Sequence, residues 1–334
     1  MKLAILIRHQ EPFSHRIYRE NIGCELNTLG VEVLPFPEDH PLPKACDLVW
    51  EPGLAGSRLP HPLLKNIQCP FVVTVHGAGP FTMKWDEIYP TFLQALRGKI
   101  QEFRTLFAWR WLKKRVSAVI TVSEFGARET SRVFDLPQDI IYSIYHGVDH
   151  SIFHAHGKKP DTGSSYFLHV SQYKPKKNVD RILAAYATLP EDGRPDLIAI
   201  VPGYRGKMTH GRGVRIITDR CSSADLATWY RGGTGFVFPS LHETFGLPVL
   251  EAMACGCPVI TSDGGACAEV SGDAALLVNP RSTGDIAQAM KRFMEDEPLR
   301  QLLRRKGIAR SQQFTWQKSA EKHRDVFEKV LRRS

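Results

Sequence analysis

The chemistry that the sequence predicts most directly lies between two glutamates, Glu243 and Glu251, which have seven residues between them. The loop after Glu243 supplies backbone N–H groups from Thr244, Phe245, Gly246 and Leu247. If a helix begins here, these groups and the positive end of its dipole favour an anion. An anion alone would repel both carboxylates, so we expect a ligand with phosphate for the amides and hydroxyls for the carboxylates. A nucleotide sugar is such a ligand; the alternative for Glu251 is a structural glutamate that favours the helix dipole.

A strand, a helix and a second strand must position this loop. Residues 235–238 form an apolar run typical of a buried strand. Pro248 suits the first position of a helix, and Gly256 suits a left-handed residue after its end. Residues 259–261 predict the next strand. Two parallel strands joined by a helix place the loop at the carboxyl edge of a sheet, where open α/β sheets bind ligands.

The rest of the chain repeats this alternation of strands and helices, which predicts parallel sheets covered by helices. The expected strands include 3–7, 31–36, 47–50, 71–75, 116–122, 196–201 and 214–217, and the expected helices include 13–29, 88–115, 223–231 and one from Ser123 to Phe134.

The stretch PSLHETFGLPVLEAMACGCPVITSDGG resembles the E-x7-E motif of the retaining glycosyltransferases of family 4. VVTVHGAGPF, IYHGVDHSIF and YFLHVSQYKPKKN are similar to further segments of that family. The resemblance implies an α/β protein of the GT-B type, with two Rossmann-like domains whose parallel sheets face a deep interdomain cleft. We expect an acceptor-side domain over 1–155, a nucleotide-sugar domain over 156–314, and a helix over 315–334 that packs back onto the first domain.

The resemblance also implies roles for single residues. His76 and Glu243 would contact the donor sugar, Lys177 would hold the donor diphosphate together with the amides of Thr244 to Leu247, and Glu251 would bind the ribose hydroxyls. Gln172 stands where the family has an arginine that shares the diphosphate charge. The loop after the first strand, RHQEPFSHRIY, lacks the usual glycine pair, so Arg8, His15 or Arg16 are alternative contacts for phosphate or acceptor.

The expected reaction is retaining transfer of a hexosyl group to a hydroxyl of a glycan, a lipid-linked acceptor or a glycolipid. No Asp-x-Asp occurs in the chain, so we expect neither a metal nor another cofactor. One alternative is a catalytically degenerate protein that only binds nucleotide sugars. Another is a different GT-B enzyme, such as a sugar epimerase or a phosphorylase.

Length, charge and cysteine content indicate the number of domains, the charge of the ligand and the cellular compartment. With 334 residues the chain is long enough for two domains, and its net charge of +9 suits a phosphorylated ligand or an anionic membrane. We find no nucleic-acid recognition motif, and we expect neither a signal sequence nor a membrane-spanning segment. The seven scattered cysteines predict reduced thiols in a cytoplasmic protein. Residues 97–115 mix basic and aromatic side chains, which indicates either contact with anionic lipid at the inner face of the plasma membrane or a solvated basic helix with its aromatics in the core.

Overall fold

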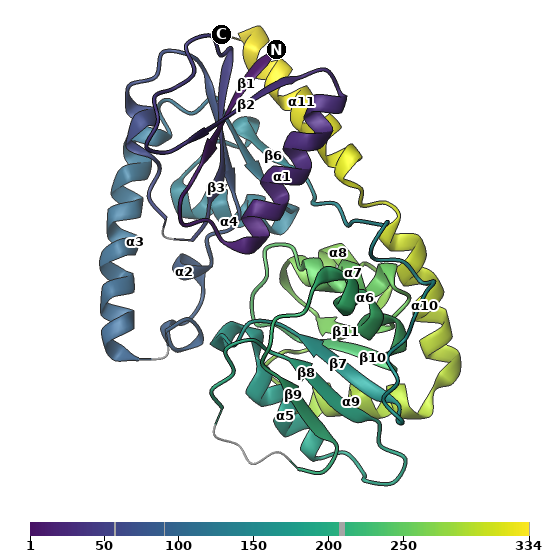
Figure 1. Cartoon of the computed structure of the whole chain (residues 1–334). Helices are drawn as coiled ribbons and strands as arrows, with labels where there is room; N and C mark the ends of the chain where they lie inside the picture. Colours follow the sequence, from purple (N-terminus) through teal and green to yellow (C-terminus); the bar gives the residue numbers. More distant parts are fainter. Residues whose placement is uncertain (57, 90, 207–210, 334) are drawn as a thin grey trace. The chain divides into compact units, whose positions relative to one another are not determined.

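The computed structural model describes residues 1–56, 58–89, 91–206 and 211–333. The chain forms two compact units, one made of Met1–Gly147 and Thr315–Ser334 and the other of Val148–Phe314. Each unit is a six-stranded parallel sheet covered by helices (Figure 1), which confirms the expected α/β class with two Rossmann-like domains. The first unit thus ends at Gly147, before the boundary at 155 that the sequence predicted, and it takes in the C-terminal helix.

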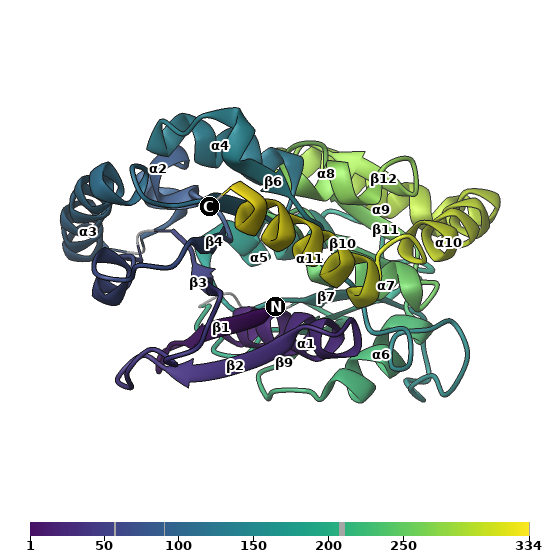
Figure 2. The ribbon, with the colours of Figure 1, turned by 90° about the horizontal axis from the view of Figure 1, so that it is seen from above.

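The sheet of the first unit has the strand order β2-β1-β3-β4-β5-β6. Its strands are β1 (Lys2–Ile7), β2 (Glu32–Pro37), β3 (Leu48–Leu54), β4 (Phe71–Val75), β5 (Ala118–Thr121) and β6 (Ile141–Ser143). Its α-helices are α1 (Phe13–Thr28), α2 (Gly79–Thr82), α3 (Phe92–Leu112), α4 (Glu124–Phe134) and α11 (Trp316–Arg333). Figure 2 shows β1 beside β2 at one edge; the strand order reverses between β1 and β3.

The alternation of side chains along the strands builds two cores in this unit, one on each face of the sheet. Leu3 and Ile5 of β1 pack on one face with α1 and α11, and Ala4 and Leu6 pack on the other with α3 and α4. This period of two is what a strand buried on both faces requires. Ser123 caps α4 as predicted, since its side chain accepts a 2.9 Å hydrogen bond from the N–H of Gly126.

The sheet of the second unit has the strand order β12-β11-β10-β7-β8-β9. Its strands are β7 (Tyr166–Val170), β8 (Asp196–Ile200), β9 (Val214–Ile217), β10 (Gly235–Phe238), β11 (Val259–Ser262) and β12 (Ala275–Val278). Its α-helices are α5 (Val179–Ala187), α6 (Ser223–Gly232), α7 (Leu247–Ala254), α8 (Gly265–Ser271), α9 (Thr283–Glu295) and α10 (Glu297–Ser311). Chain order reverses between β7 and β10, which is the position where such sheets bind ligands.

Two local signals around α7 can be compared with the structure. Gly256 has the predicted left-handed conformation, with φ of 72°. Pro248 occupies the second helical position instead of the first, because α7 already begins at Leu247.

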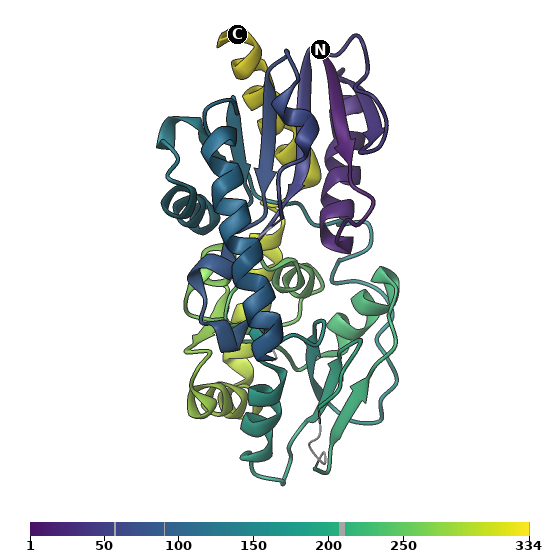
Figure 3. The same ribbon diagram turned by 90° about the vertical axis from the view of Figure 1, so that its left-hand side faces the viewer.

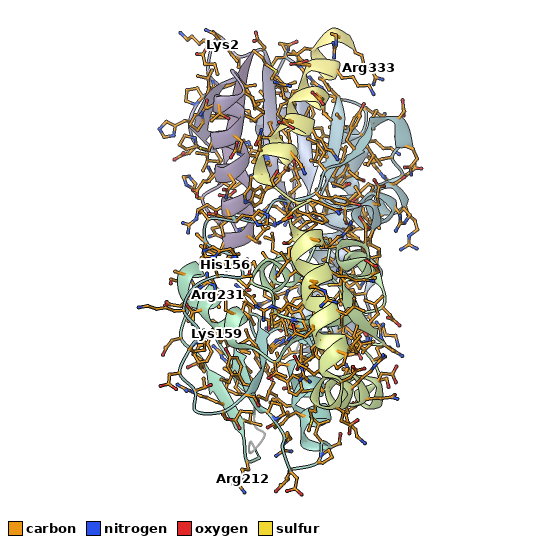
Figure 4. The ribbon with its side chains drawn as sticks, turned by 90° about the vertical axis from the view of Figure 1, so that its right-hand side faces the viewer. Lys2, His156, Lys159, Arg212, Arg231 and Arg333 are labelled. Atoms are coloured by element: carbon orange, nitrogen blue, oxygen red, sulfur yellow. The ribbon has the colours of Figure 1, made fainter. Side chains whose placement is uncertain are left out.

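The segment that enters the second unit is fastened to α6 by Arg231. Its guanidinium donates to the carbonyl oxygens of Ile152, at 3.0 Å, and His154, at 2.8 Å. Figure 4 shows His156 and Lys159, from the same segment, near Arg231.

Candidate active site

The candidate site lies where two loops of the second unit meet, after β7 and after β10. The two strands pair directly, with Gly235 beside Phe167 and Phe236 beside Leu168, so their following loops emerge together at the carboxyl edge. The N–H of Leu241, in the second loop, donates a 2.8 Å hydrogen bond to the carbonyl of Lys176, in the first. The switch point of this sheet therefore brings together the two sequence motifs that were predicted to bind the donor.

Lys177 and Glu243 form an ion pair at this point, with 2.5 Å between Nζ and Oε1. Their side chains are 16% and 11% exposed, so water screens the pair weakly. The ammonium of Lys177 also lies 5.0 Å from the ring centroid of Phe238, a cation–π contact. Burial alone would raise the pKa of Glu243, but the charges of Lys177 and Lys176 outweigh it and lower the pKa to about 2. Glu243 is therefore an anion that holds a cation in place.

Ser240 is a site residue that the sequence did not single out. Its Oγ lies 2.7 Å from Oε1 of Glu243 and 2.8 Å from the carbonyl of Lys176. The single hydroxyl proton serves one of these acceptors at a time. Ser262, at the end of β11, in turn donates a 2.5 Å hydrogen bond to the carbonyl of Ser240. Its position two residues after a buried strand was the available signal for Ser240.

Asn178 fixes the end of the loop that carries Lys177. It has a left-handed backbone, with φ of 64°, which asparagine tolerates better than most residues. Its amide group donates to the carbonyls of Pro239, at 2.8 Å, and Pro280, at 2.6 Å. Asn178 thus ties the first loop to the second and orients the preceding lysine.

His169 joins β7 to β10 and to the start of the loop that carries Lys177. Because a carbonyl only accepts, Nδ1–H of this histidine donates to the carbonyl of Val237 at 2.8 Å, and Nε2 accepts from the hydroxyl of Ser171 at 2.7 Å. Burial lowers the pKa of His169 to about 4, so the ring is neutral. An isolated histidine inside an apolar strand offered no sequence signal for this role.

In the loop between the two glutamates, side chains and backbone have different roles. Gly246 has φ of 95° and precedes α7, a conformation that strains any residue with a Cβ. Phe245 is buried, with its ring centroid 6.1 Å from that of Phe314. The side chain of Phe245 therefore anchors the loop, and only its backbone N–H fits the predicted donor contact; Thr244 and Leu247 are half-buried.

Glu251 and Gln172 are the two remaining residues of the second unit that were predicted to bind the donor. Glu251, on α7, accepts a 3.1 Å hydrogen bond from the hydroxyl of Tyr230. Burial raises the pKa of Glu251 to about 7, against the opposing effect of that hydrogen bond. Gln172 follows the buried Ser171 and is itself exposed, on the loop that leads to Lys177. Their roles toward a ligand stay predictions.

In the first unit, His76 follows β4 and its side chain is engaged in internal contacts. Nε2–H of His76 donates a 2.8 Å hydrogen bond to the carbonyl of Pro52. The ring stacks on His15, with 3.9 Å between centroids, and lies 5.7 Å from the ring of His146. Burial lowers the pKa of His76 to about 4. A neutral, buried ring is what the structure establishes; its contact with donor sugar stays a prediction.

Arg8 does not fit the phosphate contact that we considered for it. Its guanidinium is held by Glu51, by Glu38 at 3.2 Å and by the carbonyl of Leu59 at 3.1 Å. Glu51 is fully buried in β3, and burial raises its pKa although the charge of Arg8 opposes this. The guanidinium therefore compensates the buried carboxylate of Glu51 and also pairs with the half-buried Glu38. Throughout the described part of the chain, no three His, Cys, Asp or Glu side chains are grouped so that they could hold a metal ion.

Two protein-family models match consecutive parts of this chain. The model "Glycosyltransferase Family 4" matches residues 46–152, and the model "Glycosyl transferases group 1" matches residues 153–310. Together they take in the elements from β3 of the first unit to α10 of the second.

Among curated proteins, the chain is similar to O-antigen chain mannosyltransferase B of Escherichia coli, at 30% identity over 218 residues. That match covers 60% of this chain and 57% of the relative. It is also similar to the serotype-specific mannosyltransferase WbdA of Escherichia coli, at 28% identity over 73% of this chain and 31% of the relative. The chain thus spans less than two thirds of either relative.

Among solved structures, sucrose-phosphate synthase of Thermosynechococcus elongatus matches with a TM-score of 0.78 and 17% identity, over 100% of both chains. Anabaena Alr3699/HepE in complex with UDP-glucose matches with a TM-score of 0.70 and 16% identity, over 98% of this chain and 100% of that one. At these identities the likeness establishes the fold.

Proposed function

Because this chain belongs to glycosyltransferase family 4 and has the GT-B fold of its structural neighbours, we propose that it is a retaining glycosyltransferase. The donor is a nucleoside-diphosphate sugar, and the acceptor is a hydroxyl group of a glycan, a lipid-linked sugar or a glycolipid. The observation that carries the proposal is the ion pair of Lys177 and Glu243, which lies at the switch point of the second sheet.

The pair supports donor binding because it keeps a cation beside Glu243, in the loop that leads into α7. When the bond between the anomeric carbon and the diphosphate breaks, negative charge develops on the leaving oxygen. Lys177 and the N–H groups that precede α7 stabilise this charge, and a fixed donor of this kind contributes most in a site that excludes water. Glu243 holds Lys177 until the diphosphate arrives and then accepts hydrogen bonds from the donor sugar.

The acceptor attacks from the face that the diphosphate leaves, so the anomeric configuration is retained. The acceptor oxygen forms the new bond to the anomeric carbon as the carbon–phosphate oxygen bond breaks. The acceptor proton passes to the leaving phosphate oxygen, which balances the step without a protein nucleophile. Glu251 binds the ribose hydroxyls in this proposal, and His76 contacts the donor sugar from the first unit.

The comparisons narrow the substrates that we propose. Both Escherichia coli relatives are named mannosyltransferases, which favours mannose as the transferred hexose. Alr3699/HepE was solved with UDP and UDP-glucose, which supports a nucleoside-diphosphate donor. We propose that the reaction needs no metal, since Lys177 and the loop amides provide the positive charge, and that the enzyme works at a membrane surface.

A two-stage assay tests this function with the purified full chain. A thermal-shift screen with GDP-mannose, UDP-glucose and ADP-glucose identifies the donor, because a ligand that binds only the folded state raises Tm. Release of nucleoside diphosphate is then measured with and without excess EDTA. We expect one donor to raise Tm and to be turned over equally well in both buffers.

Lys177→Ala and the matched surface variant Lys291→Ala identify the site in the same assay. Lys177→Ala should lower turnover by about 10²–10³, the usual loss for one oxyanion contact, and Lys291→Ala should not change it. Donor binding without any release of diphosphate, with sugar acceptors present, would favour the degenerate binding protein instead. Activity lost in EDTA and restored by Mg²⁺ would contradict the metal-independent reaction.

A further inference from the structure

Helix α3 exposes its apolar side chains to solvent. Its exposed apolar residues are Phe92, Leu93, Leu96, Ile100, Phe103, Leu106 and Phe107. Phe92, Phe103 and Phe107 are 75%, 72% and 62% exposed. Their spacing of three and four residues places most of them on one continuous stripe of the helix. Figure 3 shows α3 as the outermost element of this part of the first unit, with the strands behind it.

The opposite face of α3 is the one that packs on the unit. It consists of smaller or polar residues and two apolar anchors: Ala95, Glu102, Thr105, Trp109 and Leu112. Glu102 is buried there, where it accepts hydrogen bonds from Tyr89 at 3.1 Å and from Lys99 at 2.8 Å. Gly98 allows the ring of Tyr89 to pack directly on the helix backbone. The helix α3 therefore packs against the first unit through its more polar face.

Basic residues accompany the apolar stripe. At about 100° per residue, Arg97 and Arg104 lie along one edge of the stripe, whereas Lys99 and Arg110 lie among its apolar residues. All four are exposed. The only acidic residue within α3 is the buried Glu102, so the outer face carries positive charge alone. Of the two alternatives for residues 97–115, Trp109 follows the one that places aromatics in the core, whereas Phe103 and Phe107 are exposed. The apolar surface also begins earlier than residue 97, at Phe92.

This pattern is that of a helix that lies in the plane of a membrane interface. None of the described helices is sufficiently long and apolar to span a bilayer. An apolar stripe accompanied by basic residues instead inserts its side chains to the level of the acyl boundary while its cations contact lipid headgroups.

We propose that α3 docks this protein on the surface of an anionic phospholipid bilayer, with the stripe of Phe92 to Phe107 inserted. The positive charge of this helix face decides between this partner and a second copy of the chain. Two copies meeting through α3 would bring Arg97, Arg104 and their counterparts together, which is unfavourable. An anionic bilayer neutralises the same groups, and each contributes favourably near such a surface.

Vesicle co-sedimentation of the full chain tests this proposal in the absence of any nucleotide sugar, so the result is independent of the proposed activity. The vesicles are phosphatidylcholine alone or phosphatidylcholine with phosphatidylglycerol. We expect binding to the anionic vesicles only, weakened at high salt because screening reduces the headgroup contacts.

Two pairs of variants separate the stripe from its basic edge. F103E/F107E should lower vesicle binding at least about tenfold, since it places charges in the inserted face; Phe13→Glu, at an exposed phenylalanine of α1, is its matched control. R97Q/R104Q should lower binding about tenfold or more, and K318Q/K322Q on α11 should have little effect. Circular dichroism melts confirm that each variant is folded.

Equal absence of the wild-type chain from both kinds of vesicle would overturn the proposal. So would a dimer in light scattering that F103E/F107E dissociates while vesicle binding is absent, because the stripe would then join two copies. Binding that Phe13→Glu weakens as strongly as F103E/F107E would also contradict it.

Discussion

The imidazole rings of His15 and His76 stack in the first unit with their planes inclined by only 16°. Burial, and then the charges of His76 and His146, lower the pKa of His15. A second group, linked by hydrogen bonds, lies beside this stack. Trp50 donates to Thr74 at 2.9 Å, and Tyr18 lies 3.1 Å from Thr74 and 2.5 Å from Nε2 of His323. Because Nδ1–H of His323 donates to the carbonyl of Ser319, Nε2 must accept the proton of Tyr18.

We predict that this group of histidines makes the fold sensitive to acid. The pKa of His76 is about 4 in the folded chain against an ordinary 6.5, so between these values the unfolded chain binds a proton that the folded chain does not. Stability therefore falls as pH drops through this window, by about 1.4 kcal/mol per pH unit for each such proton. His15→Gln removes one of these groups, and its Tm should fall less than that of the wild type between pH 7 and pH 5.

His40→Gln is the control, since His40 is exposed. Its Tm should follow the wild-type pH dependence. Parallel melting curves for His15→Gln and the wild type at every pH would show that the stack does not set the acid response.

A second prediction separates the contribution of the Lys177–Glu243 pair to stability from its contribution to turnover. Lys177→Met or Glu243→Gln alone leaves the other charge buried and unpaired, which should lower the free energy of unfolding by about 3–5 kcal/mol. The double variant K177M/E243Q should recover most of this stability because it leaves no unpaired charge. Its turnover should stay low, since the diphosphate still lacks its cation.

Urea unfolding and donor turnover measure the two effects in the same variants. K291M/E295Q removes an exposed ion pair at 3.7 Å and should change the free energy of unfolding by about 0–1 kcal/mol. Recovery of activity in K177M/E243Q would mean that neither charge serves the reaction.

A third prediction concerns Glu251, whose pKa rises from 4.5 to about 7 because of burial. Between these pH values the folded chain keeps a proton that the unfolded chain has released, so this group destabilises the fold as pH increases. Glu251→Gln should therefore gain Tm relative to the wild type from pH 5 to pH 8. The same variant should bind the donor more weakly, because a carboxylate accepts ribose hydroxyls better than an amide does.

Melting curves at both pH values and donor titrations check the two halves of this prediction. Glu191→Gln, at an exposed glutamate, should change neither quantity. A Glu251→Gln variant that binds donor as well as the wild type would return Glu251 to a purely structural role.

A fourth prediction follows from two thiols near the start of β3 and β4. The Sγ atoms of Cys46 and Cys69 lie 4.0 Å apart, and both side chains are half-buried. Diamide, which accepts two electrons and two protons, should join them as a disulfide before it crosslinks any other pair. Burial and the neighbouring Cys46 raise the pKa of Cys69 to about 11, so the reaction should be faster at pH 9 than at pH 7.

Peptide mapping under non-reducing conditions identifies the bond. Cys69→Ser should abolish it, whereas Cys24→Ser, at an exposed cysteine, should not affect it. Equal crosslinking of several cysteine pairs would contradict the preference for this one.

Local sequence signals predicted most of the fold because each of them acts within a few residues. Apolar runs bounded by proline or glycine located β4, β9 and β10 to the residue. The three-residue strand β6 lies at the edge of its sheet and is half-buried, so its composition carries little signal. It was missed for that reason.

The sequence predicted single residues of the candidate site but not how they contact one another. The motifs identified Lys177 and Glu243, but their contact depends on which strands are neighbours, which no local pattern specifies. Ser240 and His169 were missed for the same reason, since their hydrogen bonds join separate strands and loops. Periodicity likewise predicts that α3 has an apolar face but does not state that this face points away from the core.

The route of the chain through the two units has a consequence for biosynthesis. Trp316, Ala320 and Phe327 of α11 cover the sheet face that carries Leu3 and Trp50, yet they follow the whole second unit in the chain. The ribosome must therefore synthesise all of Val148–Phe314 before α11 is available to cover that face of the first sheet. The second unit is one uninterrupted segment of the chain, so it can complete its fold first. Until α11 is synthesised, the first unit exposes an apolar sheet face that a chaperone can bind.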